Sequence, residues 1–383
     1  MPFRLRSRLG PLRNPPDPKK LYDKGRRLTG RRGFSLIALR MLKRKERHGV
    51  LINLTDHCVQ LARLGRMDVR PLAVDTFAEI AAGDAGSVAR WLDVNFSDRT
   101  GRLISAYCGF HPTERIFQRD AINVRRLTDR DFLYNVVAEQ AKIVSAKAWH
   151  VAALNSSDGM PLDPESTART ALYMGVPWAA SREAQVRLRD WGVRPRRLEL
   201  GTPVLLGGLT RYMAQTNYPH LIAACEIFRN QTFLYLIGRD GVHTPPPLPH
   251  GLLSVEEAAM KELNVPDAMA ARKLLESPTE ELRHHGRRLI RMLSRHLRPA
   301  VDYFEMQTGQ RIGALFCAHL PERLSWLEEA LATAVDLEYF SPDYARWVEA
   351  VGLDVPGHTL LGPSWLQPLS LVAQLAPGAP PAA

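Results

Sequence analysis

The sequence has few cysteines, and they lie far apart. The 383 residues contain Cys58, Cys108, Cys225 and Cys317, and no two of them have the CxxC spacing of a zinc site. Such a pattern is also unlike the dense disulfide framework of small secreted proteins. We therefore expect reduced, mostly buried thiols, and we predict no metal site.

Long apolar runs are also absent. No stretch of about 18 or more uncharged apolar residues occurs, so no membrane-spanning helix is predicted. Residues 1–50 are rich in arginine and interrupted by prolines, unlike a secretory signal. We expect a cytoplasmic protein.

Familiar catalytic patterns are missing as well. The sequence contains no GxSxG motif, and the adjacent His284 and His285 lack the four-residue spacing of zinc ligands on a helix. We therefore name no catalytic residue.

Positive charge is concentrated at one end of the chain. The net charge is +11, but residues 1–49 contain 16 Lys and Arg against three acidic residues, and the remainder is slightly acidic. We interpret residues 1–47 as a basic arm that is largely disordered or forms a short amphipathic helix. The candidate membrane or partner contacts in it are Arg26, Arg27, Arg31, Arg32, Lys43, Arg44 and Lys45.

Charge alone favours an anionic membrane surface or an acidic partner for this arm. A purely solvated tail is the alternative. Nucleic acid is less favoured, because no aromatic interleaving or zinc-finger spacing accompanies the basic residues.

The body of the chain reads as an α/β protein with two similar hairpins. With 45% hydrophobic and 24% charged residues, it has the composition of a globular chain long enough for two lobes. Residues 49–66 and 220–242 each contain two apolar runs separated by a polar turn, which predicts a β-hairpin. Residues 128–146 and 280–307 are predicted as helices, the first with Thr128 as its N-cap.

The first hairpin resembles the opening strand-turn-strand of the PilM family of actin-like proteins, whose pattern is close to G-I-D-I-G-S-S-S-V-K. Here Asn53 stands at the aspartate, Thr55 at the glycine, Asp56, His57 and Cys58 at the hydroxyl positions, and Gln60 at the lysine. In such a loop glycine admits phosphate to the backbone and the carboxylate organises hydrated magnesium. Each of these features is altered.

The two later nucleotide elements of the family are altered too. The pattern D-I-G-x-x-x-T is matched by Glu226, Phe228 and Thr232, with a benzyl group where the glycine stands. The glycine-rich turn that holds adenosine falls at Ile312–Leu331, where Cys317 and Ala318 replace glycines. All three elements have lost their chemistry, so we expect no cofactor, and ATP with magnesium is disfavoured.

The resemblance implies a bilobal actin-like fold of the duplicated ribonuclease H-like type. Its divisions here would be residues 48–212 for the first lobe, with an inserted subdomain at about 95–185, residues 213–375 for the second lobe, and a disordered tail at 376–383.

The resemblance also implies a function. PilM-like proteins act at the inner membrane in type IV pilus or related secretion machines, where they dock the cytoplasmic tail of a PilN-like subunit and connect to motor ATPases. By resemblance, the docking groove would involve about residues 66–180. We therefore expect a scaffold that is a pseudo-ATPase. The alternatives are an active actin-like ATPase or kinase and a nucleic-acid-binding protein that uses the basic arm.

Overall fold

The computed structural model describes residues 48–374 except 68, 98–102, 158, 160, 161, 163 and 164. The predicted basic arm, with its seven candidate contact residues, and the predicted tail at 376–383 lie outside this part of the chain. None of the described helices is both long enough and apolar enough to cross a lipid bilayer.

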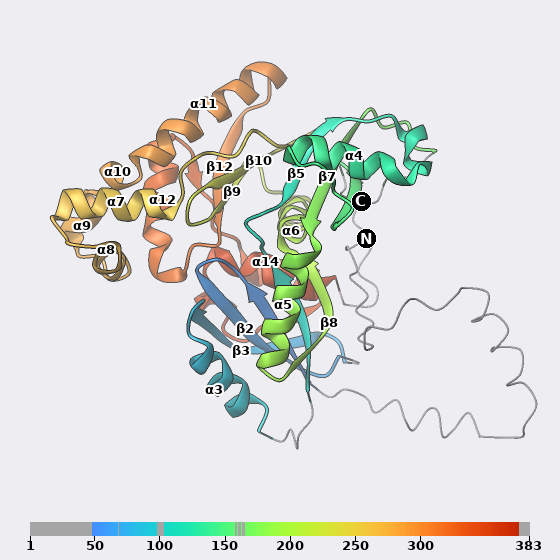
Figure 1. Cartoon of the computed structure of the whole chain (residues 1–383). Coiled ribbons are helices and arrows are strands. Elements are labelled where there is room, and N and C mark those ends of the chain that lie inside the picture. Colours follow the sequence, from blue (N-terminus) through green and yellow to red (C-terminus); the bar gives the residue numbers. More distant parts are fainter. Residues whose placement is uncertain are drawn as a thin grey trace, which may run out of the picture.

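Three sheets organise the described chain (Figure 1). The first has the order β14-β3-β2-β1-β4-β8, with strands Leu353–Asp354, Leu72–Ala81, Cys58–Leu64, Gly49–Leu54, Ile104–Phe110 and Val193–Leu200. The second has the order β11-β10-β9-β12-β13, with strands Gly241–His243, Thr232–Gly238, Leu221–Ile227, Ile312–Ala318 and Glu338–Tyr339. The third has the order β5-β7-β6, with strands Ile116–Ala121, Thr170–Pro177 and Trp149–Asn155.

The first two sheets repeat one topology. In each, an antiparallel meander (β1-β2-β3 or β9-β10-β11) continues beyond its first strand through two parallel strands. These are β4 and then β8 in the first sheet, and β12 and then β13 in the second. Both predicted hairpins are therefore present, as β1-β2 and β9-β10. The third sheet falls between β4 and β8 in sequence, inside the range that the sequence assigned to an insertion.

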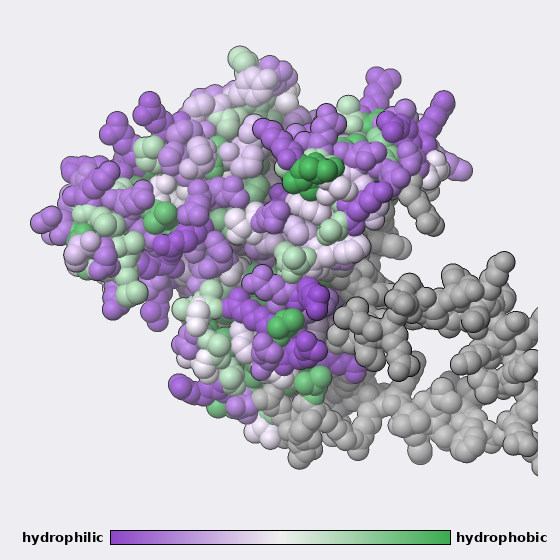
Figure 2. Space-filling view, in the orientation of Figure 1, coloured by the Kyte–Doolittle hydropathy of each residue, from purple (hydrophilic) through white to green (hydrophobic). Residues whose placement is uncertain are grey.

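Helices cover both large sheets. Those of the first lobe are α3 (Ala85–Asn95), α5 (Trp178–Asp190), α6 (Gly201–Thr216), α13 (Tyr344–Ala350) and α14 (Leu366–Ala373). Those of the second lobe are α7 (Leu252–Leu263), α8 (Ala268–Leu275), α9 (Glu280–His284), α10 (Gly286–Leu289), α11 (Arg291–Thr308) and α12 (Ser325–Ala334). Helix α4 (Arg130–Ala141) packs on the third sheet. Hydrophilic residues cover most of the face in Figure 2, including the surface over α7, α10 and α11.

The C-terminal residues return to the first lobe. The sequence assigned residues 213–375 to the second lobe, but β14 pairs with β3, and α14 packs on α6, β1 and β4. The buried side chains of Trp347, Trp365 and Leu369 join the core of the first sheet. This apolar burial, which local sequence patterns do not reveal, brings Gln367 into the space between the lobes.

Two predicted helices differ in detail. The helix expected at 280–307 is broken into α9, α10 and α11 at His285 and Ile290, whose ψ angles of −5° and 6° depart from the α-helical value. Helix α4 is capped by Asp129, whose carboxylate accepts from the Asp131 amide, and not by Thr128. The Thr128 hydroxyl instead donates to the carbonyl of Arg125 within the short 3-10 helix Val124–Thr128.

Candidate functional site: the cleft between the two repeated hairpins

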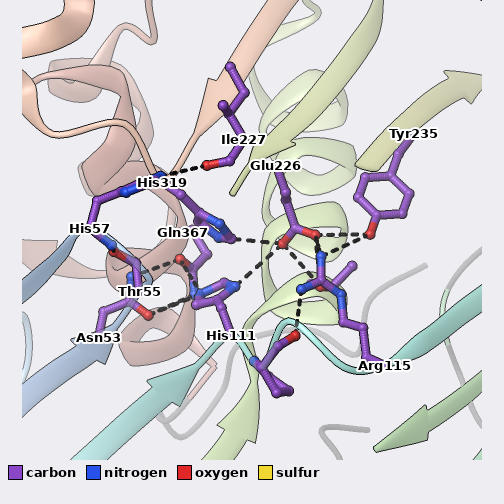
Figure 3. A network of polar contacts seen from close by, with 12 residues as sticks. Asn53, Thr55, His57, His111, Arg115, Glu226, Ile227, Tyr235, His319 and Gln367 are labelled. Atoms are coloured by element: carbon purple, nitrogen blue, oxygen red, sulfur yellow. Dashed lines mark hydrogen bonds and ion pairs between the residues drawn. The ribbon is translucent and has the colours of Figure 1, made fainter. Parts of the chain in front are cut away.

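The turns of the two hairpins touch each other across the space between the lobes. The carboxylate of Asp56 accepts from the backbone amide of Arg229 at 3.1 Å, and Nε2 of His57 donates to the carbonyl oxygen of Ile227 at 3.0 Å. Two residues at predicted phosphate-facing positions therefore bond the second hairpin directly. Figure 3 shows the His57 contact at one side of the polar network.

Thr55 turns inward to its own hairpin. Its hydroxyl donates to the Cys58 carbonyl at 2.9 Å and accepts from the Cys58 amide at 3.0 Å, while the side chain is buried. These bonds close the turn, which is the local motif that threonine favours. The hydroxyl is thus committed to the hairpin and is not directed into the cleft.

Asn53 and Gln60 form an amide network where the family pattern has a carboxylate and a cation. They face each other in register on β1 and β2, and the Asn53 amide donates to Oε1 of Gln60 and of Gln367, each at 2.9 Å. The Gln60 amide donates to Ser364 at 3.3 Å. All these side chains are buried, so the network ties the first hairpin to the returning C-terminal segment.

Glu226 on β9 is the charged centre of the cleft and is fully buried. It accepts hydrogen bonds from Arg115, from the Tyr235 hydroxyl at 2.9 Å and from the Thr202 hydroxyl at 3.0 Å (Figure 3). Burial alone would raise the pKa of this carboxyl, but the Arg115 guanidinium and the hydrogen bonds hold the pKa well below its usual range. The carboxylate is therefore ionised and already paired.

Arg115 enters the cleft from the segment between β4 and β5. Its guanidinium lies 4.5 Å from the ring centroid of Phe228 and 4.1 Å from that of Phe233, and it donates to the Pro112 carbonyl at 2.9 Å. Cation–π contacts of this kind strengthen when the cation is desolvated. The positive charge beside Glu226 is thus supplied by the chain itself.

Phe228 and Thr232 complete the second hairpin. Phe228 is fully buried, with edge contacts to Phe233 at 5.6 Å and His319 at 5.0 Å. The buried Thr232 hydroxyl donates to the His250 carbonyl at 2.8 Å. The benzyl group is therefore part of the core between the two hairpins.

The third predicted element contributes a residue that the sequence reasoning did not choose. Cys317 and Ala318 are buried and pair through the backbone with Cys225 and Glu226. The next residue, His319, has a φ of 76°, a left-handed conformation that favours glycine. Glycine-like backbone geometry is thus retained at the predicted glycine turn, but with an imidazole projecting into the cleft.

His111 occupies the same position in the first repeat as His319 in the second. Each follows the last residue of an equivalent strand, β4 or β12, and the ring centroids lie 3.9 Å apart. The His111 ring packs on the backbone of Gly201, where an added Cβ would lie 1.8 Å from it. Burial lowers the pKa of both histidines, opposed by the Glu226 charge, so both imidazoles are neutral at physiological pH.

The sequence patterns thus identified residues of the two hairpins, but they missed most of the side chains that pack between them. His111, Arg115 and Gln367 belong to no short motif, and they reach Glu226 or Asn53 only through the fold. His319 lies at the predicted glycine turn, but its contact with Glu226 was not predicted. The repeated topology could have indicated His111 and His319, because each directly follows the last residue of an equivalent strand.

Two repeated sheets whose first hairpins contact each other between the lobes define the class: the chain has an actin-like ATPase fold, as predicted. The fold is that of PilM in a solved PilM-PilN type IV pilus biogenesis complex, which is similar with a TM-score of 0.61 and 16% identity, covering 86% of this chain and 98% of that one.

More distant similarities were also found. The ethanolamine utilization protein EutJ from Carboxydothermus hydrogenoformans has a TM-score of 0.45 and 10% identity, over 85% of this chain and 89% of that one. A Bacteroides thetaiotaomicron protein with an actin-like ATPase fold has a TM-score of 0.39 and 7% identity, over 77% and 91%. No protein-family model and no curated protein matches the sequence.

Proposed function

We propose that this protein is a non-catalytic scaffold of a type IV pilus or related secretion machine. In this proposal it works at the cytoplasmic face of the inner membrane and docks the cytoplasmic tail of a PilN-like membrane subunit, with a motor ATPase as a further partner. The actin-like fold serves as a binding platform for these partners, and the protein does not hydrolyse nucleotide.

The observation that carries the non-catalytic part is the direct bonding of the two hairpins. Asp56 and His57 bond the second hairpin at 3.1 and 3.0 Å, and Phe228 is buried between the lobes. Phosphate would have to break these contacts and meet the carboxylate of Asp56. An active ATPase or kinase is disfavoured for this reason.

The partner is proposed from the likeness in fold to PilM, which extends over nearly all of that chain. The predicted docking range, residues 66–180, includes the junction between the first and third sheets, where β7 leads into α5. Trp178, which is 51% exposed, begins α5, and its ring lies 6.0 Å from that of His150. An exposed tryptophan at a junction between subdomains is the kind of anchor that dominates binding energy.

The test is a fluorescence anisotropy titration of the full chain into a labelled peptide of the N-terminal tail of its PilN-like subunit. We expect saturable binding that Trp178→Ala weakens by roughly tenfold or more, the effect of losing an aromatic anchor. Tyr303→Ala on α11 is the matched control, since that residue is 62% exposed but lies on the second lobe. Absence of binding, or equal losses in the two variants, would contradict the proposal.

The basic arm is proposed to add contact with an anionic membrane surface. Residues 1–49 contain 16 Lys and Arg, and such a charge binds acidic lipid through electrostatics that salt screens. Deleting residues 1–45 should abolish sedimentation with vesicles that contain phosphatidylglycerol. If the deletion instead abolished salt-sensitive binding to DNA while leaving vesicle binding intact, the nucleic-acid alternative would be favoured.

A further inference from the structure

The side chains of His111, Glu226 and His319 converge, and the histidine nitrogens that face the carboxylate have no hydrogen-bond partner among the described residues. Oε1 of Glu226 lies 3.4 Å from Nδ1 of His111 and 3.5 Å from Nε2 of His319, and all three side chains are buried (Figure 3). Nδ1 of His111 and both ring nitrogens of His319 have no hydrogen-bond partner among the described residues. Buried nitrogen atoms without partners are rare, and they point to a missing ligand.

The hydrogen-bond partners of Nε2 determine which ring nitrogen of His111 carries the proton. Nε2 lies 3.2 Å from Oδ1 of Asn53 and 3.1 Å from Oε1 of Gln367. Both atoms are acceptors, because the two amides donate to each other's oxygens at 2.9 and 3.3 Å. Nε2 therefore carries the hydrogen, and the neutral ring presents a lone pair at Nδ1 toward the carboxylate.

The lone pair on Nδ1 of His111 and the carboxylate oxygen Oε1 of Glu226 face each other in a buried site and repel. A cation bound between these two atoms would be attracted to both. The separations fit such an ion. A tetrahedral zinc site with bonds of about 2.1 Å places neighbouring ligand atoms about 3.4 Å apart. The observed spacings from Oε1 are 3.4 and 3.5 Å, and all three ligand atoms lie within 4.8 Å of one another.

Neighbouring side chains orient His111 and Glu226 by hydrogen bonds, as is usual for the ligands of metal sites. The amide oxygens fix the His111 ring, and the Tyr235 and Thr202 hydroxyls and Arg115 fix the Glu226 carboxylate. Arg115 contacts Oε2, whereas Oε1 accepts from the Thr202 hydroxyl at 3.0 Å and keeps a second lone pair for a metal ion. Its charge opposes a second cation nearby, so an anionic fourth ligand such as hydroxide is expected.

We propose that His111, Glu226 and His319 bind one divalent transition-metal ion, with Zn²⁺ as the best fit, and that this ion fixes the two lobes together. Two nitrogens and one oxygen suit Zn²⁺, whereas Mg²⁺ requires an octahedral set of oxygens. His111 belongs to the first lobe, and the other two ligands belong to the second. The sequence reasoning predicted no metal site, because these residues are 115 and 93 positions apart and form no motif. This metal site is independent of the proposed docking of a PilN-like subunit.

The experiment begins with the full chain stripped by a chelator that is then removed. Titration with Zn²⁺ should show one equivalent bound and a Tm that rises to saturation, while Mg²⁺ should have no effect. Co²⁺ should give the visible absorption of a four- or five-coordinate site without a thiolate charge-transfer band, which excludes the four buried cysteines as ligands. A thiolate band, weak octahedral absorption or no binding would overturn the proposal.

His319→Gln is the first variant, because His319 makes no hydrogen bond within the described chain and its replacement leaves no partner behind. Zn²⁺ affinity should fall on the order of 100-fold or more, since loss of an outer-shell partner alone typically costs about 10- to 100-fold. The matched control is His296→Gln, which removes a histidine whose ring lies 4.7 Å from His250 on the second lobe and should leave binding unchanged. Equal affinity in the parent and His319→Gln would also overturn the proposal.

Discussion

Arg115 and Glu226 are 111 positions apart in the sequence, belong to opposite lobes, and form an ion pair in which neither side chain is exposed. The pair lies next to Phe228 in the second hairpin, whose ring centroid is 4.5 Å from the Arg115 guanidinium. A buried charge is stabilised only while its partner is present. The structure therefore depends on this contact, and the lobes are held in one arrangement by charges that the chain itself provides.

Breaking the ion pair should be costly. Arg115→Met leaves the Glu226 carboxylate buried without its cation, so we expect the free energy of unfolding to fall by about 3–5 kcal/mol. Urea unfolding measures this loss. The double variant Arg115→Met/Glu226→Gln should recover part of it, because no unpaired charge remains.

The matched control is the half-exposed ion pair of Arg63 and Asp75, whose side chains are 38% and 35% exposed at a distance of 2.9 Å. Arg63→Met should cost less than about 1 kcal/mol, since solvent screens the pair. Equal losses at Arg63 and Arg115, or strict additivity in the double variant, would mean that the buried pair is not coupled.

A single methyl group at Gly201 should displace His111. An added Cβ there would lie 1.8 Å from the His111 ring, whereas Gly207 of the same helix has open space around it. We expect Gly201→Ala to lower the free energy of unfolding by about 3 kcal/mol through overpacking. Gly207→Ala should be neutral or stabilising by up to about 1 kcal/mol, because alanine is the better helix former. Thermal unfolding of both variants distinguishes these outcomes, and equal Tm values would refute the packing of His111 on Gly201.

Phe228 should behave as a core residue. Its ring is fully buried and contacts Arg115, Phe233 and His319. Phe228→Ala is expected to destabilise the fold by about 3–5 kcal/mol through the cavity that it leaves. Tyr303→Ala, at a position that is 62% exposed, is the reference and should change stability little. A loss at Phe228 as small as that at Tyr303 would indicate an open pocket at the hairpin.

His57 should make stability depend on pH. Burial, with the Arg272 charge next in importance, lowers the pKa of His57 from 6.5 to about 4, although its bond to Ile227 opposes the shift. Between these two values the unfolded chain binds a proton that the folded chain does not, so stability is full above about pH 6.5 and declines as the pH falls toward 4. The decline from this group is up to about 3 kcal/mol.

The readout is the difference in urea unfolding between the parent and His57→Gln at pH 7 and at pH 4.5. The glutamine amide can still donate to the Ile227 carbonyl but does not titrate, so the variant should lose less stability on acidification than the parent. Identical pH profiles would show that His57 is not buried in its neutral form.

The hairpins were predictable because their signals are local. Alternating apolar runs and polar turns mark β1-β2 and β9-β10, and the spacing of Asn53, Thr55 and Gln60 matched a known pattern. Phe228 is buried at the second turn, and the exclusion of phosphate there stays a prediction. The use of Asp56 and His57 as bonds between hairpins was not predicted, because it requires both lobes to be placed.

The remaining parts of the site depend on long-range packing. Gln367 reaches Asn53 only because the C-terminal helix packs on α6, and Arg115 reaches Glu226 from a segment without any motif. The helix predicted over 280–307 is divided at His285 and Ile290. Helical periodicity continues through such a break, so the sequence pattern gave no sign of it.

The most direct test of the central claim, that the cleft between the lobes does not take nucleotide, is a thermal-shift titration of the full chain with ATP and Mg²⁺. A nucleotide at 100 times its dissociation constant would add about 2.7 kcal/mol of stability and raise the Tm visibly. The account predicts no shift in the parent. A saturable rise would contradict it, because ATP could bind only by separating Asp56 and His57 from the second hairpin, and the protein would then be a nucleotide-dependent switch.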